Sequence, residues 1–243
     1  MSLFAKLFLD NKSVFFDVTG FNYFLLVYTP TPREAEGGAN GADGEGPRHH
    51  IVGFFSKEKM SWDNNNLACI LIFPSWQRKG LGALLMGVSY EISRREGILG
   101  GPEKPISDLG KKGYKRFWAG EIARWLLGLE LSDEAETVID VGECSMATWI
   151  AAEDCLAVLR EMSVMEDAGT GPPRGQENPK EEETVEGEGE EPAKPQLVPR
   201  VRVSKAAVRN WITLNGISLE RTCDPEGFTK DYAPKATEEE DEE

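Results

Sequence analysis

The run Asn66–Phe73, NLACILIF, constrains the fold more than any other part of the sequence. It is apolar almost throughout, which is typical of a central strand covered on both faces. The following PSWQRKGLG breaks the strand, and the segment 82–95 then spaces Leu84, Leu85 and Val88 as on one side of a helix. The sequence therefore predicts a buried strand, a glycine turn and an amphipathic helix in succession, within an α/β (α+β) domain.

The turn Gln77–Gly82, QRKGLG, places two glycines directly before this helix. The first N–H groups of a helix have no partner inside it, and the helix dipole favours an anion there. Gly80 and Gly82 would let the backbone approach a pyrophosphate without a Cβ in the way, while Arg78 and Lys79 add positive charge. Taken alone, the same pattern also fits an ordinary strand-to-helix turn.

Further elements surround this unit. The β-branched and aromatic runs at 12–18 and 22–29 predict a β-hairpin, and 51–56 predicts another strand. Ser107 is placed to cap the N-terminus of a helix over 108–128.

The C-terminal half contains a smaller unit. Residues 132–162 predict two short helices, 197–204 a strand and 205–216 a last helix. Helix, helix, then strand is the order of a winged-helix module. We therefore expect a core over 1–130, a helical C-terminal region over 131–219 and a tail over 220–243.

Most of the negative charge is local. The net charge is -15, yet residues 166–197 hold ten acids against three bases, and 238–243 are all acidic. We expect the insert 166–197 and the acidic tail to be disordered, as well as the Gly- and Pro-rich loop 31–50. The folded part is near neutral, so the low pI says little about its binding face.

The cysteines and the hydropathy predict the type of cellular compartment in which the chain resides. The four cysteines are widely spaced with no CxxC pair, and no apolar run approaches about 18 residues. Together these predict free thiols in a reducing intracellular environment and no membrane span. His49 and His50 have no partner at metal-ligand spacing, so no metal site is expected.

Several blocks follow one another in a recognisable order: LFLDNKSVFFDV, IVGFFSKEK, NNLACILIFPSWQRKGLGALL, SRREG and PEKPISDLG. The series resembles the MYST family of histone (lysine) acetyltransferases, closely over 3–130 and more weakly over 131–162 and 198–219. The segment RVSKAAVRNW is most similar to the SAS-type fungal branch. The resemblance implies a GNAT-like acetyl-CoA-binding fold for 1–130, followed by a small winged-helix-like region.

The resemblance also implies how acetyl-CoA is held. The backbone of Ile70, Leu71 and Ile72 would hold the acetyl and pantetheine end, and Ser107 would contact the cofactor as well. The pyrophosphate loop would consist of Gln77, Arg78, Lys79, Gly80, Leu81, Gly82 and Ala83.

Three further residues match family positions with chemical roles. Glu103 in GPEKP matches the general base, which is needed because a lysine with a pKa near 10.4 is protonated at neutral pH. Cys69 matches the active-site cysteine, which either accepts the acetyl group or lies beside the thioester; alone it would also fit a small buried apolar residue. Lys12 matches the lysine that the family acetylates on itself, although Asn11 stands where the family usually has His.

The resemblance implies a zinc-finger part ahead of AKLFLD in the family, and we expect this chain to lack it. Two functions therefore stay open: a nuclear acetyltransferase acting on histone tails within a chromatin-modifying complex, and a catalytically impaired truncated homologue acting as an interaction subunit. Direct nucleic-acid binding is disfavoured, since the candidate recognition segment WIAAEDCLAVLREM has three acids and one base.

Overall fold

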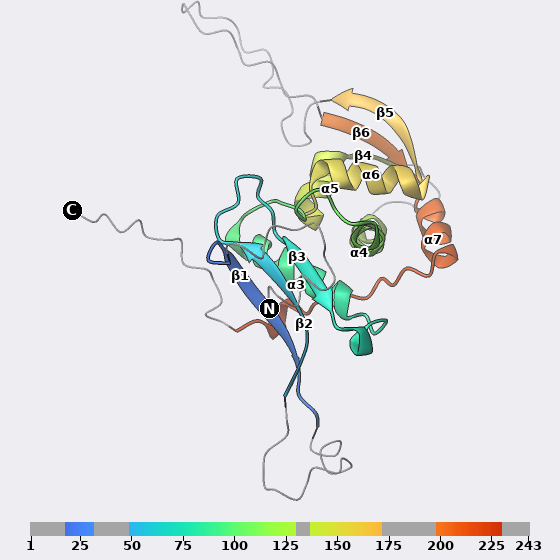
Figure 1. Cartoon of the computed structure of the whole chain (residues 1–243). Helices are drawn as coiled ribbons and strands as arrows, with labels where there is room; N and C mark the ends of the chain where they lie inside the picture. Colours follow the sequence, from blue (N-terminus) through green and yellow to red (C-terminus); the bar gives the residue numbers. More distant parts are fainter. Residues whose placement is uncertain (1–17, 32–48, 130–136, 172–197, 230–243) are drawn as a thin grey trace, which may run out of the picture. The chain divides into compact units, whose positions relative to one another are not determined.

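The computed structural model describes residues 18–31, 49–129, 137–171 and 198–229 (Figure 1). The chain divides into two compact units, one made of 1–114 and 221–243 and the other of 115–220. The division falls inside helix α4, Asp108–Gly128, whose bounds match the predicted helix. Among the described helices, none is long and apolar enough to cross a membrane.

The first unit is built on an antiparallel sheet with the strand order β1-β2-β3. The strands are β1 (Phe21–Tyr28), β2 (His50–Glu58) and β3 (Cys69–Ile72). Both strands are rich in aromatic and branched apolar residues, which suit a pleated sheet, and Phe55 and Phe54 of β2 are buried in two separate core clusters. The predicted strand 12–18 lies outside the described residues, as does most of the loop predicted at 31–50.

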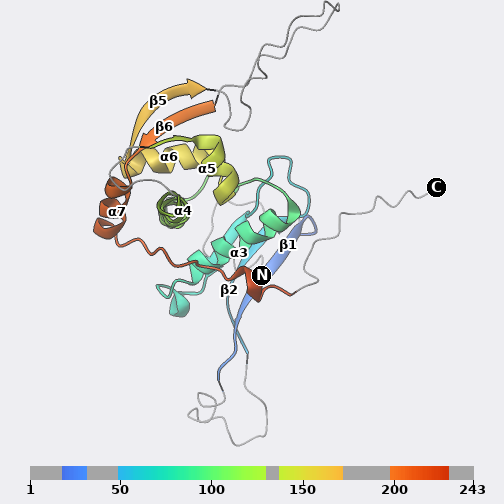
Figure 2. The ribbon, with the colours of Figure 1, turned by 180° about the vertical axis from the view of Figure 1, so that it is seen from behind.

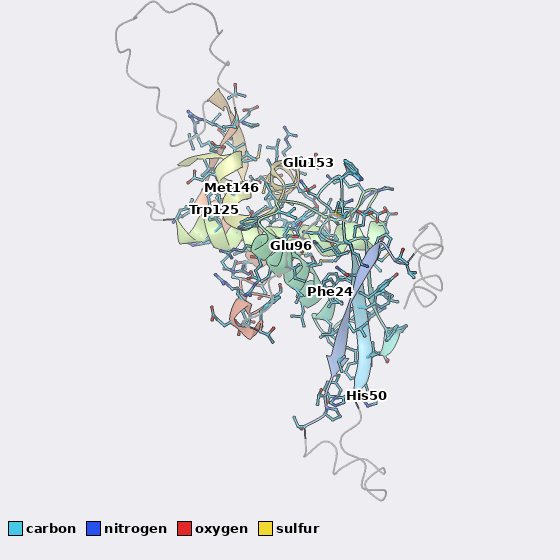
Figure 3. All side chains as sticks on the ribbon, turned by 90° about the vertical axis from the view of Figure 1, so that its left-hand side faces the viewer. Phe24, His50, Glu96, Trp125, Met146 and Glu153 are labelled. Atoms are coloured by element: carbon cyan, nitrogen blue, oxygen red, sulfur yellow. The ribbon has the colours of Figure 1, made fainter. Side chains whose placement is uncertain are left out.

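One face of this sheet packs against helix α3, Leu81–Glu96 (Figure 2). Phe24 of β1, labelled in Figure 3, stacks on Phe55 of β2 with 4.6 Å between ring centroids. Phe55 is fully buried in a cluster with Leu85 and Ile92 of α3. The amphipathic pattern predicted over 82–95 therefore does face the sheet.

The segment 221–228 returns to the first unit and packs on α3. The Arg95 guanidinium donates to the Pro225 carbonyl oxygen at 2.8 Å and lies 4.4 Å from the centre of the Phe228 ring. A Cβ at Gly87 would come within 2.6 Å of Thr222 Oγ1, so glycine permits this close approach. The prediction placed these residues in a tail; the structure differs because tertiary packing, which local composition does not show, holds them.

The second unit contains a sheet and short helices. Its elements are β4 (Thr137–Asp140), α5 (Val141–Thr148), α6 (Ala152–Met162), β5 (Met165–Gly171), β6 (Val198–Val203) and α7 (Lys205–Leu214). The sheet is antiparallel in the order β4-β6-β5. Asp140 Oδ1 caps α5 by accepting from Gly142 N–H at 2.6 Å, and Ser204 Oγ caps α7 by accepting from Ala207 N–H at 3.3 Å. The helices α5 and α6 are followed by the paired strands β5 and β6, and the winged-helix-like character of this region stays a prediction.

Strand β5 differs from the prediction of an insert disordered from residue 166. The polar stretch of Met165–Gly171 is ordered by its backbone pairing with β6, and Glu166 lies 3.8 Å from Arg202 across the pair. Asp167 Oδ1 accepts from Gly169 N–H at 2.8 Å, where Gly169 has φ +81° and the register shifts. Composition alone does not reveal a strand whose stability comes from a partner far along the chain.

Candidate functional site

Cys69 begins β3 at an irregularity in the pairing with β2. Ala68 N–H donates to the Ser56 carbonyl oxygen at 2.8 Å, while Cys69 N–H donates to the Ser56 hydroxyl oxygen at 3.2 Å. Ser56 thus receives both amides, one on its backbone and one on its side chain. Cys69 is 3% exposed and Ser56 is fully buried, so Cys69 is held at a position that is shielded from solvent.

The outer edge of β3 has no strand partner in the described sheet order, because β2 occupies only the other edge. Phe73 N–H donates to the Val52 carbonyl oxygen at 3.0 Å. With the observed register, the alternation of an antiparallel pair then points the amides of Ile70 and Ile72 away from β2, and that of Leu71 towards it. The amides of Ile70 and Ile72 therefore lie along the outer edge of β3, and the contact of these residues with acetyl-CoA stays a prediction.

The turn between β3 and α3 keeps its backbone open. After a short 3₁₀ turn at Pro74–Trp76, Gln77 Nε2 donates to the Ile72 carbonyl oxygen at 2.9 Å, which ties the turn to the edge of β3. Arg78 and Gly80 have φ of 60° and 78°. Gly80 is the N-cap of α3 and no side chain caps the helix there.

The first turn of α3 contains amides that have no acceptor within the helix. Leu84 N–H donates to the Gly80 carbonyl oxygen at 3.1 Å and is the first amide bonded within the helix. The N–H groups of Leu81, Gly82 and Ala83 precede that bond. A Cβ added at Gly82 would meet no atom within 4 Å, so nothing in the described chain itself requires a glycine there. The turn has room for a group from outside.

The segment Gly100–Glu103 runs beside the start of β3. Asn66 N–H donates to the Gly101 carbonyl oxygen at 2.9 Å, and Glu103 N–H donates to the Leu67 carbonyl oxygen at 2.8 Å. A parallel bridge joins Leu67 to Pro102 between these two bonds. The structure therefore anchors half-buried Glu103 to the backbone two residues before Cys69.

Comparison with known proteins matches residues 1–184 to the MOZ/SAS family. The chain belongs to the MOZ/SAS family. The MOZ/SAS chain is 42% identical over 165 residues to "Histone acetyltransferase MOF" of Drosophila melanogaster, covering 68% of this chain and 18% of that protein. It is 42% identical over 160 residues to "Histone acetyltransferase ESA1" of Gibberella zeae, covering 66% and 29%. It is 39% identical over 164 residues to "Histone acetyltransferase Tip60 homolog" of Caenorhabditis elegans, covering 68% and 32%. The chain thus spans less than a third of the length of these relatives.

Ser107, which the resemblance implies as a cofactor contact, caps the N-terminus of α4 in the structure. Its hydroxyl oxygen accepts from Gly110 N–H at 3.2 Å, and its carbonyl oxygen accepts from Lys111 N–H at 2.7 Å, so Ser107 starts α4 as predicted. The side chain is at the surface, and its contact with a cofactor stays a prediction. Lys12 lies outside the described residues.

Sequence reasoning on this MOZ/SAS chain missed three residues near the site. Ser56 interrupts an apolar strand, and that interruption was the available signal. Asn66 is 1% exposed, and neither atom of its side-chain amide has a hydrogen-bond partner among the described residues. Tyr23 is brought to Cys69 only by the register of the sheet, which no local pattern reveals.

A cavity of about 570 Å³ lies elsewhere in the first unit of the MOZ/SAS chain, between the C-terminal part of α3 and the segment 221–226. None of the predicted site residues lines it. Three arginines and three acids share its walls, together with Cys223 and Pro225 (Glu91, Arg94, Arg95, Arg221, Asp224 and Glu226). The candidate site is thus the open edge of β3 and the turn that follows, rather than this cavity.

Proposed function

We propose that the chain transfers the acetyl group of acetyl-CoA to the ε-amine of histone lysines. One observation carries the proposal: Cys69 begins β3, the Glu103 backbone is bonded to Leu67 just before it, and the outer edge of β3 leads to the open turn at the N-terminus of α3. The outer edge of β3 would thus connect Cys69 and Glu103 to the turn at the N-terminus of α3, where an anion could bind. That order suits a thioester with a diphosphate at its far end.

The residues along this track fit acetyl-CoA. The amides of Ile70 and Ile72 face outward and can meet the amide groups of the pantetheine arm. The N–H groups of Leu81, Gly82 and Ala83 can receive the diphosphate at the positive end of α3. The open space at Gly82 gives the strongest support. A side chain at this position would clash with no atom of the described chain, but it would occupy the space through which a diphosphate reaches the amides.

The chemistry requires a base. A lysine ammonium must lose a proton before its nitrogen can attack the thioester carbonyl carbon. Glu103 accepts that proton, and the neutral nitrogen forms the C–N bond. As the C–S bond breaks, the second proton that the nitrogen loses passes to the leaving sulfur, which departs as the thiol of CoA. Cys69 serves either as an intermediate acceptor of the acetyl group or as a neighbour of the thioester in a ternary complex.

Backbone amides near Cys69 can stabilise the oxyanion that forms on the carbonyl oxygen. Cys69 N–H already donates to Ser56, so it is occupied. Ile70 N–H points away from β2 and is the nearest amide after Cys69 that could stabilise the oxyanion.

The test is transfer of labelled acetyl from acetyl-CoA to a histone peptide, comparing the wild type with Glu103→Gln. The substitution removes the base and keeps the size of the side chain, so the rate falls at neutral pH. The loss shrinks as pH rises, because more substrate lysine is already neutral. Glu153→Gln on the exposed face of α6 makes the same chemical change in the other unit and serves as the control. A Glu103→Gln rate equal to the wild type at neutral pH would remove Glu103 from this role.

We further infer a nuclear protein that acts on histone tails as a subunit of a chromatin-modifying complex. The named relatives support the substrate class, since each is called a histone acetyltransferase. Assignment to the SAS-type branch stays a prediction. The other candidate, an interaction subunit without turnover, would bind acetyl-CoA or a complex partner yet release no acetylated peptide in the same assay.

A further inference from the structure

Tyr23, Ser56 and Cys69 form one row across the three strands of the first sheet. Tyr23 of β1 lies opposite Ser56 of β2, and Ser56 lies opposite Cys69 of β3. Residues directly opposite one another project from the same face of a sheet. The side chains of Tyr23 and Cys69 therefore share a face, with the small Ser56 between them.

The row brings the phenol near the cysteine. Neighbouring strands lie about 4.8 Å apart, so the backbones at Tyr23 and Cys69 are separated by about 10 Å, within reach of a tyrosine and an acyl-cysteine extending towards each other. The Tyr23 ring is held on this face by Phe54, with centroids 6.2 Å apart and planes tilted by 44°. The short Ser56 side chain lies between them, and its hydroxyl is bonded to Cys69 N–H.

The Tyr23 hydroxyl is shielded from solvent and has no hydrogen-bond partner among the residues that the structure describes. A shielded hydroxyl without a partner is destabilising, and phenylalanine would pack against Phe54 without that cost. Burial, and after it the neighbouring Cys69, raises the pKa of Tyr23. The phenol therefore stays protonated at neutral pH and is a hydrogen-bond donor in need of an acceptor.

We propose that the Tyr23 hydroxyl donates a hydrogen bond to the carbonyl oxygen of the acetyl group held at Cys69. The inference rests on the proposed acetyl transfer, and it holds whether the acetyl group is bonded to Cys69 or lies beside it, because both routes bring the same carbonyl oxygen there. Negative charge develops on that oxygen as the nitrogen attacks, so a donor aimed at it stabilises the transition state more than the ground state. Tyr23 is then a catalytic residue on β1, a strand to which the sequence assigned no chemistry.

The experiment compares Tyr23→Phe with the wild type and with Tyr28→Phe. The control makes the same change at the far end of β1, where the Tyr28 ring contacts Trp76 with centroids 4.9 Å apart. We expect Tyr23→Phe to keep or raise the wild-type melting temperature, to keep the KM for acetyl-CoA, and to lose about tenfold or more in kcat. Tyr28→Phe retains the wild-type kcat.

The second readout is the infrared carbonyl band of acetyl-CoA labelled with ¹³C at the acetyl carbonyl, recorded in its bound state. The Tyr23 hydrogen bond lowers the frequency of this band in the wild type and in Tyr28→Phe, and the band moves back up in Tyr23→Phe. An unchanged kcat together with an unchanged band in Tyr23→Phe would overturn the proposal. The band needs only bound acetyl-CoA, so a wild type that binds without turnover refutes the transferase proposal and still tests Tyr23. A wild type that does not bind acetyl-CoA refutes both.

Discussion

The amide of Cys69 donates to the hydroxyl of Ser56 at 3.2 Å, so a side chain on β2 replaces the backbone acceptor that this amide would otherwise have. We predict that Ser56→Ala leaves the amide buried without an acceptor. The expected loss is about 1–3 kcal/mol of unfolding free energy, together with reduced acetyl transfer because Cys69 is no longer held. Urea denaturation measures the first and the peptide assay the second.

Ser89→Ala is the matched control for this prediction. Ser89 is also fully buried, but its hydroxyl donates to the Met86 carbonyl oxygen at 2.8 Å within α3. The Met86 carbonyl oxygen still accepts a hydrogen bond within the helix, so Ser89→Ala leaves no buried polar group without a partner. Equal losses for the two variants would contradict a special role of Ser56.

Gly82→Ala should separate cofactor binding from folding. The space at Gly82 is open, and alanine stabilises a helix relative to glycine by up to about 1 kcal/mol, so we expect an unchanged or raised melting temperature. The methyl group would occupy the approach to the amides of the first turn, and acetyl-CoA affinity should fall at least tenfold in calorimetric titration. Gly128→Ala, at the end of α4 with the same open space, is the control. A Gly82→Ala chain with wild-type affinity would rule out this diphosphate site.

Gly80→Ala should behave differently. Its φ of 78° is in the left-handed region, so alanine there costs about 1–2 kcal/mol of stability in addition to any effect on binding. We expect both the melting temperature and the affinity to drop. A stability equal to the wild type would mean that the turn rearranges.

Tyr114 should govern stability at alkaline pH. Burial, and after it the neighbouring Tyr90, raises the pKa of Tyr114 well above its ordinary value of 10.0. Its contribution to stability is therefore complete below pH 10 and is lost as pH rises towards the folded-state pKa, because only the unfolded chain ionises in that window. We expect unfolding free energy to decline above pH 10, and less steeply in Tyr114→Phe. Denaturation at a series of pH values tests this, and equal slopes for both chains would contradict it.

Phe228→Ala should loosen the segment 221–228 from α3. The ring packs partly buried against the core of the first unit and under the Arg95 guanidinium, so we expect a loss of about 1–2 kcal/mol. Limited proteolysis should then cut this segment faster than in the wild type. Leu219→Ala, just outside the packed segment, is the control, and indistinguishable cleavage rates would show that Phe228 does not hold the segment.

Local patterns were sufficient for the elements that their own residues specify. The helix over 108–128 was predicted with its observed bounds because Ser107 supplies a cap and apolar residues follow at helical spacing. The strand before the glycine turn was placed correctly, although the regular part begins at Cys69, because the irregularity at Ser56 shortens it.

Other features depend on partners far along the chain. Strand β5 is polar and acquires order from β6, and the segment 221–228 acquires order from α3. In the site, Cys69 and Glu103 could be named from the resemblance, but Tyr23 and Ser56 could not, since only the sheet register brings them to Cys69. A register is decided by the tertiary fold, which periodicity within one segment does not specify.

The return of residues 221–228 to α3 affects the order in which the protein can be made. The second unit is continuous in sequence over 115–220, whereas the first needs residues on both sides of it. Domains fold as units during synthesis, and the N-terminal part emerges first. Here the ribosome must finish the entire second unit before it supplies Phe228 to the core of the first, so the part that bears Cys69 and Glu103 reaches its final packing last.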